Sequence, residues 1–238
     1  MQKKKLSIII PMYNEKNIKK NLQKALQIFD TFNRPYEIVL VDDGSTTNCY
    51  SEAKEVKSDK IRVVGYKPNK GKGNAIKYGA KFVTGDYVAF LDADLELDPN
   101  QLKGFIKILE ETKSDIIIGS KRHPDSKVHY PLFRRFMSIV YQIMIKILFN
   151  LNVRETQVGL KLFKRECIDS IFPKILVKRF AFDLEVLVNA NKLKYKITEA
   201  PINLDYKFGS TVSPSAVYYM LLDTAAIFYR LKILHYYG

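Results

Sequence analysis

Apolar and polar residues follow two patterns along the first half of the chain. Short apolar runs have the length of buried strands, and between them lie stretches with apolar residues at helical spacing. The expected strands are 6–10, 37–41, 61–66, 87–91, 115–119 and, later in the chain, 160–163, and the expected helices are 15–29, 51–57, 74–83 and 100–112. Strands that alternate with helices predict an α/β fold, with a mixed, mostly parallel sheet flanked by helices on both faces.

The second half differs, because it holds two long apolar stretches at about 134–151 and 215–234. Neither contains 18 uncharged apolar residues in a row, so neither is expected to span a bilayer. We expect both to be amphipathic helices at a membrane interface, with packing on the sheet or on a second subunit as the alternative. The run at 6–10 ends at Pro11 and is too short for the core of a signal peptide.

Two of the expected strands are followed directly by acidic pairs, Asp42-Asp43 and Asp92-x-Asp94. Ligands of open α/β sheets bind beyond the carboxyl ends of the strands, so these carboxylates predict a site at that edge. Two carboxylates one residue apart can share a divalent cation and leave coordination positions free for phosphate oxygens. The pattern predicts a nucleotide–metal site, in which Asp94 is the main metal ligand. Asp92 would contact metal or ribose, and Glu96 would be a further ligand.

The segment after the first strand is a candidate nucleoside site. Pro11, Tyr13 and Glu15 lie at the carboxyl end of that strand. Tyr13 can stack on a base or line its pocket, and Glu15 can accept hydrogen bonds from base or ribose. The alternative is a turn in which Asn14 caps the following helix.

The loop 69–74 is basic, carries glycines and precedes an expected helix. Backbone N–H groups at a helix start, together with a lysine such as Lys72, favour a phosphate, and an ordinary turn is the alternative. The loop lacks the spacing of a Walker motif. Asp42 or Asp43 can pair with donor groups of the base that accompanies such a phosphate.

Composition adds a charge argument. The 238 residues suffice for one large α/β domain, and the net charge is +14. This excess favours a nucleic acid, an anionic membrane surface or a phosphorylated substrate, with a solvated lysine-rich surface as the alternative. Cys49 and Cys167 lack metal or redox spacing, so we expect reduced thiols in a cytosolic compartment.

Several motifs together make the chain resemble family 2 inverting glycosyltransferases of GT-A fold. The first four, in the order of that family, are Pro11-x-Tyr13-Asn14-Glu15, Val41-Asp42-Asp43-Gly44-Ser45, Asn69-Lys70-Gly71-Lys72-Gly73 and Asp92-Ala93-Asp94. Three later motifs, at 119–122, 155–163 and 180–185, are similar to those of polyprenyl-phosphate glycosyltransferases. The last two resemble dolichyl-phosphate β-glucosyltransferases more than dolichol-phosphate mannose synthases. The resemblance extends from Leu6 to about Leu231.

The resemblance implies an enzyme that transfers one sugar, with inversion, from a nucleotide sugar to dolichyl or another polyprenyl phosphate. UDP-glucose is the favoured donor, and GDP-mannose and UDP-N-acetylglucosamine stay open. Mg²⁺ or Mn²⁺ would neutralise the charge that develops on the leaving diphosphate. We expect one GT-A domain over 1–238, with a donor half at 1–120 and an acceptor half at 121–238. It would bind the cytoplasmic face of a membrane peripherally, and a second copy or a separate anchor subunit stays open.

The same resemblance assigns roles to residues. The expected catalytic residues are Asp92, Asp94 and Asp183, and the expected metal ligands are Asp92, Asp94 and Glu96. The expected donor-binding residues are Pro11, Tyr13, Glu15, Asp42, Asp43, Lys72, Asp92, Ala93, Asp94, Lys121, Lys178 and Lys207. Arg134, Arg135 and Gln157 are expected at the acceptor phosphate. Because that phosphate is already an anion, it needs little help from a base, and Asp183 is expected to orient or to balance charge.

Three positions depart from the family pattern. Lys121 stands where the family usually has Arg, Thr211 where it often has Lys, and Glu96 where mannose synthases often have Gln. These departures change the side chains offered to the phosphates, and Glu96 would add a negative charge to the metal shell.

Other functions stay open. A transferase that acts on a sugar hydroxyl would need a true catalytic base, for which Asp183 is the candidate. A silent binder of nucleotide sugar or a nucleic-acid-binding module is more distant. Carboxylates at the strand ends would repel a nucleic-acid backbone in the absence of a metal, so no nucleic-acid partner is expected.

Overall fold

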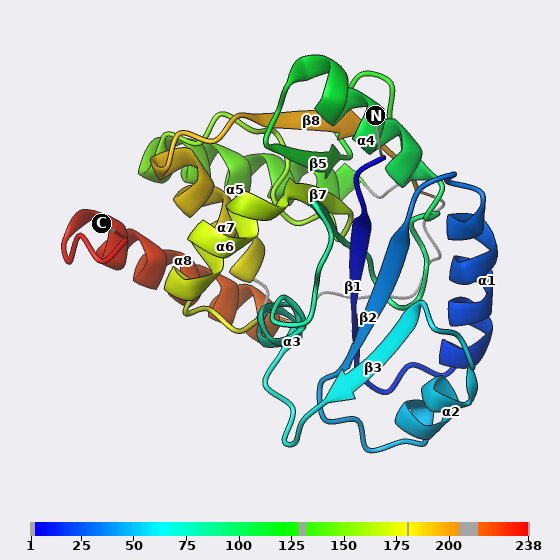
Figure 1. The fold of residues 1–238 in the computed structure, drawn as a ribbon. Helices are drawn as coiled ribbons and strands as arrows, with labels where there is room; N and C mark the ends of the chain where they lie inside the picture. The colour runs from blue at the N-terminus through cyan, green and yellow to red at the C-terminus, as the bar shows by residue number, and fades with distance from the viewer. Residues whose placement is uncertain (1–2, 129–131, 180, 205–213, 238) are drawn as a thin grey trace.

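The computed structural model describes residues 3–128, 132–179, 181–204 and 214–237, without the side chains of 132–136, 214 and 216 (Figure 1). The strands are β1 (Leu6–Met12), β2 (Tyr36–Asp42), β3 (Ile61–Gly65), β4 (Tyr87–Phe90), β5 (Ile116–Ser120), β6 (Lys127–Val128), β7 (Lys161–Lys164), β8 (Ile197–Pro201) and β9 (Asn203–Leu204). The helices are α1 (Ile18–Asp30), α2 (Cys49–Glu55), α3 (Lys72–Gly79), α4 (Gln101–Thr112), α5 (Leu132–Phe149), α6 (Arg165–Ile171), α7 (Phe182–Lys192) and α8 (Pro214–Lys232), with a 3-10 turn η1 (Phe172–Lys174).

Within the described residues, seven strands form one sheet in the order β3-β2-β1-β4-β7-β5-β8. β7 runs antiparallel to both of its neighbours, and the other pairs are parallel. β6 and β9 pair separately. The prediction of a mixed, mostly parallel sheet flanked by helices is confirmed. Since β1, β2, β4 and β5 run the same way, the loops that follow them meet at one edge, which we call the carboxyl edge.

Helices cover both faces of the sheet because the strands are apolar on both sides. Along β1, Ile8 and Ile10 pack with α1, α2 and α4, whereas Ile9 packs into a second core with α3, α6 and α7. Ile145 of α5 and Ile227 of α8 join this second core. Both cores are continuous with the strands whose ends carry the acidic pairs.

The helix expected from residue 15 starts at Ile18 instead. Asn14 does not cap it: the residue has a φ of 53°, and its side-chain oxygen accepts hydrogen bonds from the backbone N–H groups of Thr46 and Thr47. Asn14 therefore ties the loop after β1 to the loop after β2.

No element had been predicted from the sequence at the positions of α6, α7, β6, β8 and β9. Every residue of α7 from Phe182 to Ala190 is buried, so this helix has no polar face and no amphipathic stripe to detect. β8 is half-buried along most of its length and lacks a clear apolar run. These elements are specified by what packs against them.

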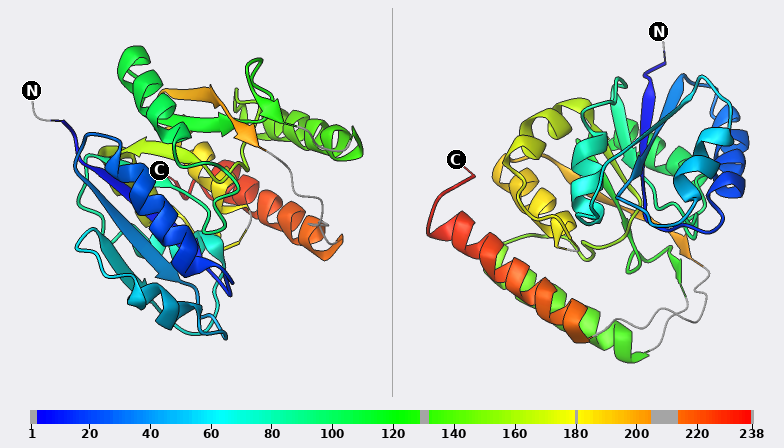
Figure 2. Two further views of the ribbon diagram at one scale, coloured as in Figure 1. Left: turned by 90° about the vertical axis from the view of Figure 1, so that its right-hand side faces the viewer. Right: turned by 90° about the horizontal axis from the view of Figure 1, so that it is seen from below.

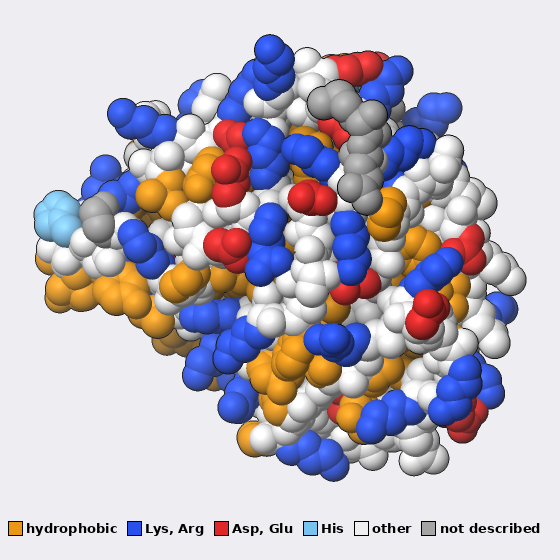
Figure 3. Space-filling model, viewed as in Figure 1, with side chains coloured by type: hydrophobic (Ala, Val, Ile, Leu, Met, Phe, Trp, Pro, Cys, Tyr) orange, Lys and Arg blue, Asp and Glu red, His pale blue; other side chains and the backbone are white. Residues whose placement is uncertain are grey.

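Helices α5 and α8 lie side by side and run in the same direction (Figure 2). The Tyr141 hydroxyl lies 3.0 Å from Thr224 Oγ1. Large apolar side chains on the outer faces are exposed, and some are visible along α8 at the left of Figure 3. We call this surface the apolar platform; its residues are Met137, Ile139, Val140, Ile143, Ile147, Tyr218, Tyr219, Leu221, Leu222, Tyr229, Ile233 and Leu234. Among the described helices, none has both the length and the apolar character to span a bilayer.

Candidate active site

A cavity of about 270 Å³ opens at the carboxyl edge of the sheet. Five of the predicted donor-binding residues line it together: Pro11, Tyr13, Asp43, Lys72 and Asp92. The Tyr13 side chain is 51% exposed, so its ring is accessible to a stacking partner. Met12, Asn69 and Gly71 complete the lining. The spacing of the motifs had indicated this edge, but not which loop backbones would form the walls.

Asp43 is buried and organises the loop 69–71. Its carboxylate accepts hydrogen bonds at 2.7–2.9 Å from the Tyr66 hydroxyl, the Asn69 amide and the backbone N–H groups of Lys70 and Gly71. These four donors fill the four acceptor positions of a carboxylate. Asp43 therefore shapes the wall of the cavity from within the chain, and a bound base would have to displace one of these donors to pair with it.

Asp42 is buried too, and its Oδ1 accepts a hydrogen bond of 3.1 Å from the backbone N–H of Ser45. This bond holds the turn after β2. Of the two acidic residues at this strand end, Asp43 lines the cavity and Asp42 supports the turn.

Negative side chains gather at the end of β4. The Asp92 carboxylate forms an ion pair with Lys72 Nζ, and Asp94 Oδ1 accepts a hydrogen bond of 3.0 Å from the Glu96 N–H. Desolvation and the like charges of Asp92 and Glu15 raise the pKa of Asp94 above its ordinary value. Desolvation alone would lower the pKa of Lys72, but the charge of Asp92 and its neighbours outweighs it and raises that pKa. The loops after β1 and β4 thus concentrate negative charge.

The described residues do not bring three His, Cys, Asp or Glu side chains together as a ready metal cluster. Of the predicted ligands, Asp94 and Glu96 are exposed and Asp92 is half-buried. A cation bound by Asp92 and Asp94 would need further oxygen ligands from outside the chain, as is usual for Mg²⁺ at nucleotide phosphates.

Gly159 brings the motif at 155–163 against this acidic strand end. A Cβ built on Gly159 would lie 2.0 Å from Asp92 Oδ2 and 2.7 Å from its Cγ. No larger residue fits there unless the carboxylate moves. A side chain at position 159 would therefore displace the Asp92 carboxylate from its present position.

Asp183 is paired with a buried lysine. Lys161, which is 1% exposed, donates a hydrogen bond of 2.7 Å to Asp183 Oδ1, and its Nζ also donates to the Val158 carbonyl. The negative charge of Asp183 also contributes to raising the pKa of Lys72. Alternating charges therefore run from Asp92 through Lys72 and Asp183 to Lys161. Lys161 had no predicted role, although a single charge inside the apolar run 160–163 was a signal for it.

The loop 155–158 joins the site to α5 and α8, the helices that carry the apolar platform. Gln157 is exposed, and its Nε2 lies 2.8 Å from the sulfur of Met220 in α8. Thr156 is buried, and its hydroxyl accepts a hydrogen bond of 3.2 Å from the Gln142 amide of α5. Gln157, predicted at the acceptor, thus lies between the carboxyl edge and the two platform helices.

The remaining predicted residues surround this region or fall outside it. The Lys178 side chain is exposed, and Lys121 is half-buried just after β5. Ala93 is buried, and its carbonyl accepts a hydrogen bond of 2.9 Å from the Asn21 amide of α1. Arg134 and Arg135 belong to α5, but their side chains lie outside the described part of the structure, as does the whole of Lys207.

Comparison with known proteins gives relatives over nearly the whole chain. It is 31% identical over 242 residues to a dolichyl-phosphate β-glucosyltransferase of Dictyostelium discoideum, covering 94% of this chain and 74% of the relative. It is 30% identical over 228 residues to the dolichyl-phosphate β-glucosyltransferase of Homo sapiens, covering 89% and 70%.

Solved structures share the fold at low sequence identity. Glucosyl-3-phosphoglycerate synthase from Mycobacterium tuberculosis, in complex with Mn²⁺, UDP and phosphoglyceric acid, superposes with a TM-score of 0.70 at 17% identity, covering 99% of this chain and 79% of that one. Mannosyl-3-phosphoglycerate synthase from Rubrobacter xylanophilus gives a TM-score of 0.66 at 16% identity, covering 98% and 75%. These likenesses support the GT-A fold.

A sequence model of one family matches most of the core of this fold. The match is to glycosyl transferase family 2 and extends over residues 7–172. It takes in the loop after β1, both acidic strand ends, the loop 69–74 and the motif at 155–163. Together with the relatives above, it shows that the chain belongs to glycosyl transferase family 2 and is a glycosyltransferase.

Proposed function

We propose that this glycosyltransferase moves glucose from UDP-glucose to the phosphate of dolichol or another polyprenol at a membrane surface. The observation that carries the proposal is the contact of the acidic carboxyl edge with α5 and α8, the helices that carry the apolar platform, through the loop 155–158. A soluble donor and a lipid acceptor need such a junction. The relatives at about 30% identity, named for transfer of glucose to dolichyl phosphate, support the same acceptor and sugar.

The donor would occupy the cavity at the carboxyl edge. The exposed Tyr13 ring offers a stacking surface for a base, and Lys72 offers a positive charge for a phosphate at the start of α3. Uridine nucleotides bound to solved neighbours of this fold support a UDP donor. The role of Asp43 would be indirect, through the loop that it holds.

The residues present fit Mg²⁺ or Mn²⁺ when a diphosphate supplies the missing ligands. Asp94 has exposed carboxylate oxygens, and the mutual repulsion of Asp94, Asp92 and Glu15 favours a bound cation. Asp92 and Asp94 would hold the ion, and Glu96 could approach it. When bound, the cation would neutralise the leaving diphosphate.

The protein's own task in the reaction is alignment. The acceptor phosphate is already an anion, so its oxygen can attack the sugar carbon opposite the diphosphate without prior loss of a proton. The ion pair of Asp183 with Lys161 favours a fixed, charge-balancing Asp183 over a mobile base. Lys121, Lys178 and Lys207 would contribute positive charge for the donor. Arg134 and Arg135 would do the same for the acceptor phosphate, to which the neutral Gln157 amide could donate a hydrogen bond.

The apolar platform would rest on the bilayer surface. Ile147 is 76% exposed, and the platform combines aliphatic and tyrosine side chains, which suit the interfacial region. The net charge of +14 would add attraction to the anionic cytoplasmic leaflet. These two contributions support peripheral binding at the cytoplasmic face.

The reaction is tested with purified protein, Mn²⁺ or Mg²⁺, a short-chain polyprenyl phosphate and a panel of nucleotide sugars, with the lipid products measured by mass spectrometry. We expect polyprenyl-phosphate glucose from UDP-glucose, and no product once the metal is chelated. A lipid product from another donor would overturn the sugar but keep the reaction. Donor hydrolysis without lipid product would favour a hydroxyl acceptor instead.

Membrane binding is tested by flotation with vesicles that contain anionic lipid. The double variant Ile147→Asp and Leu222→Asp should lose binding, because both side chains belong to the platform. Leu193→Asp is the matched control, since Leu193 is an exposed apolar residue at the end of α7 and does not belong to the platform. Unchanged flotation of the double variant, together with loss of a dimer in light scattering, would show instead that the platform binds a second copy.

A further inference from the structure

Glu185 is the most completely buried carboxylate among the described residues, and it lies two positions after Asp183. One oxygen, Oε2, accepts hydrogen bonds from the backbone N–H groups of Leu176 at 2.9 Å and Val177 at 2.7 Å. The other, Oε1, accepts from Arg230 Nη2 at 2.9 Å and from the Tyr237 hydroxyl at 2.5 Å. A buried charge with four donors is costly to disturb, because removing one partner leaves polar groups unpaired in the core.

The two oxygens bind different parts of the molecule. Arg230 lies in the last turn of α8, and Tyr237 follows that helix. Leu176 and Val177 belong to residues 175–179, which we call the bridge segment; it lies between η1 and α7. Glu185 therefore connects a platform helix to the bridge segment by a single side chain.

The bridge segment in turn packs on the loop proposed to bind the donor. The Lys178 carbonyl accepts a hydrogen bond of 3.2 Å from the Asn74 N–H. The same carbonyl lies so close to Gly71 that a Cβ there would be 2.6 Å from it, and Gly71 has a φ of 97°, which favours glycine. Lys77 of α3 donates to the Ile175 carbonyl at 2.5 Å. Both ends of the segment are thus fixed to the loop 69–74 and its helix.

A further contact reaches α8 from the same segment. The Arg179 guanidinium lies over the Tyr219 ring, 5.2 Å from its centroid. Tyr219 belongs to the exposed apolar platform, so this contact lies at the surface that would meet lipid. The bridge segment therefore contacts the donor loop on one side and α8 on the other.

We propose that Glu185 is a positioning residue that transmits the placement of α8 to the donor loop through residues 175–179. Its effect on the donor site is indirect, since its partners are backbone amides and the end of α8. Docking of α8 on a lipid surface would then favour one arrangement of the donor loop, and donor binding would favour docking to the same degree. This inference rests on the proposed function in two respects, because it takes the loop 69–74 as part of the donor site and the apolar platform as the membrane-binding surface.

Hydrogen exchange of the full chain tests the transmission without any substrate. Glu185→Gln keeps the shape of the side chain but replaces one acceptor oxygen with a donor. We expect exchange to accelerate about ten-fold, both in residues 175–179 and in residues 69–75. Asp115→Asn is the matched control: Asp115 accepts from Lys164 Nζ at 2.6 Å and from the Lys196 N–H at 2.8 Å, and it precedes β5 at the opposite edge of the sheet. It should leave both segments unchanged.

The outcomes separate a positioning role from a structural one. Faster exchange in 175–179 with none in 69–75 would overturn the proposal, as would no change in either. If Glu185→Gln does not fold, Tyr237→Phe removes one of the four donors and should give the same pattern at smaller size.

Binding of UDP with Mn²⁺, with and without anionic vesicles, then measures the coupling. Vesicles should tighten UDP binding in the wild type and not in Glu185→Gln. If the wild type binds no UDP, the proposed donor fails, while the exchange result still decides the role of Glu185.

Discussion

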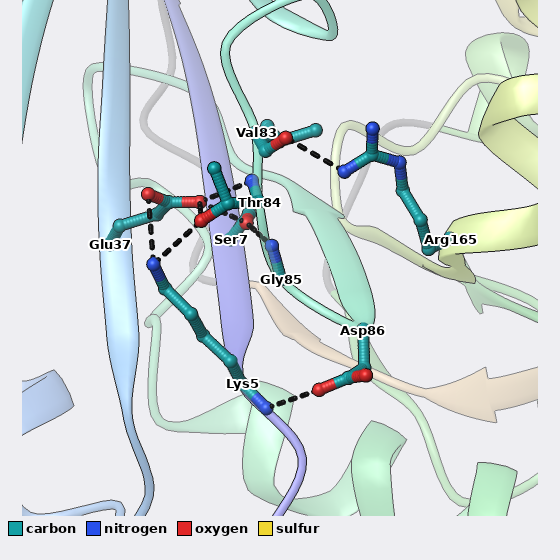
Figure 4. Close-up of polar contacts among 8 residues, drawn as sticks. All are labelled: Lys5, Ser7, Glu37, Val83, Thr84, Gly85, Asp86 and Arg165. Atoms are coloured by element: carbon teal, nitrogen blue, oxygen red, sulfur yellow. Dashed lines mark hydrogen bonds and ion pairs between the residues drawn. The ribbon is translucent and has the colours of Figure 1, made fainter.

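The two edges of the central sheet are both rich in charged side chains, but they differ in how the charges are paired within the chain. At the amino edge, Lys5 Nζ donates to Glu37 at 3.1 Å and to Thr84 at 2.7 Å, and the Ser7 hydroxyl donates to Glu37 at 2.6 Å (Figure 4). The Lys5 N–H is in turn bound to Asp86 at 2.8 Å. At this edge every carboxylate drawn in Figure 4 has its partners inside the chain.

The pKa values of one carboxylate at each edge show this contrast. At the amino edge, burial alone would raise the pKa of Glu37, but hydrogen bonds from Ser7 and Thr84 lower it overall. At the carboxyl edge, Asp94 lies near like charges. The pKa of Asp94 is raised, through desolvation and the charges of Asp92 and Glu15. A lowered pKa means that the fold stabilises the charged form of the carboxylate. A raised pKa means that the fold destabilises this charged form. The amino edge therefore contributes to stability, whereas at the carboxyl edge Asp94 keeps unbalanced charge for a ligand.

The largest effect should come from Asp94→Ala. This variant removes the exposed carboxylate at the centre of the unbalanced charge, so we expect kcat/KM to fall about 1,000-fold. The free energy of unfolding should not fall, because the repulsion from Asp92 and Glu15 is relieved. Asp98→Asn, which changes an exposed acidic residue four positions later, is the control for steady-state assays and urea unfolding. Full activity in Asp94→Ala would show that Asp94 is not a required metal ligand.

A smaller loss is expected from Gly159→Ala. The new Cβ would meet Asp92 at a distance that no carboxylate tolerates, so Asp92 has to move. A displacement of about 1 Å at reacting groups can cost about 100-fold in rate. The control is Gly104→Ala in α4, where a Cβ meets nothing within 4 Å. It should leave the rate unchanged and stabilise the fold by about 0.5–1 kcal/mol, because alanine is the better helix former. Equal rates in both variants would contradict the contact.

At the amino edge, Glu37→Gln should change stability and not rate. We expect the free energy of unfolding at pH 7 to fall by about 1–3 kcal/mol, since hydrogen bonds to a charged group are lost. The pKa of Glu37 is lowered from its ordinary value of 4.5 by folding, so its stabilisation is present above pH 4.5. The stabilisation is lost as the pH falls through the lower folded-state pKa. Urea unfolding at several pH values should therefore show the difference between wild type and variant shrinking in acid. A changed kcat/KM at pH 7 would contradict the distinction between the two edges, because the amino edge would then affect catalysis as well as stability.

The smallest effect concerns Cys167, a free thiol in α6 whose sulfur faces the Asp115 carbonyl beside the amino end of β5. Burial, with the charges of Asp115 and Glu166, raises the pKa of Cys167 to about 12. We expect a disulfide reagent at pH 8 to leave the folded protein unmodified and to react after unfolding in urea. Rapid modification of the native protein, located at Cys167 by mass spectrometry, would mean that this region opens.

Much of the donor half was predictable because its signals are local. A buried parallel strand needs an apolar run, so β1, β2, β4 and β5 could be read from short windows. Acidic residues directly after such runs must lie at the carboxyl edge in a parallel sheet, which placed Asp43 and Asp92 beside one cavity. The resemblance to the family added the order of the motifs, and with it the sugar-transfer chemistry.

The contacts that complete the site were decided by tertiary structure. Lys161 meets Asp183 across 22 positions, and Glu185 meets Arg230 across 45. Gly159 lies against Asp92 only because β7 is inserted antiparallel beside β4. A single sequence fixes where apolar faces and turns occur, since these depend on neighbours along the chain. Which distant charges become partners depends on how the buried faces pack, because burial makes an unpaired charge too costly to leave.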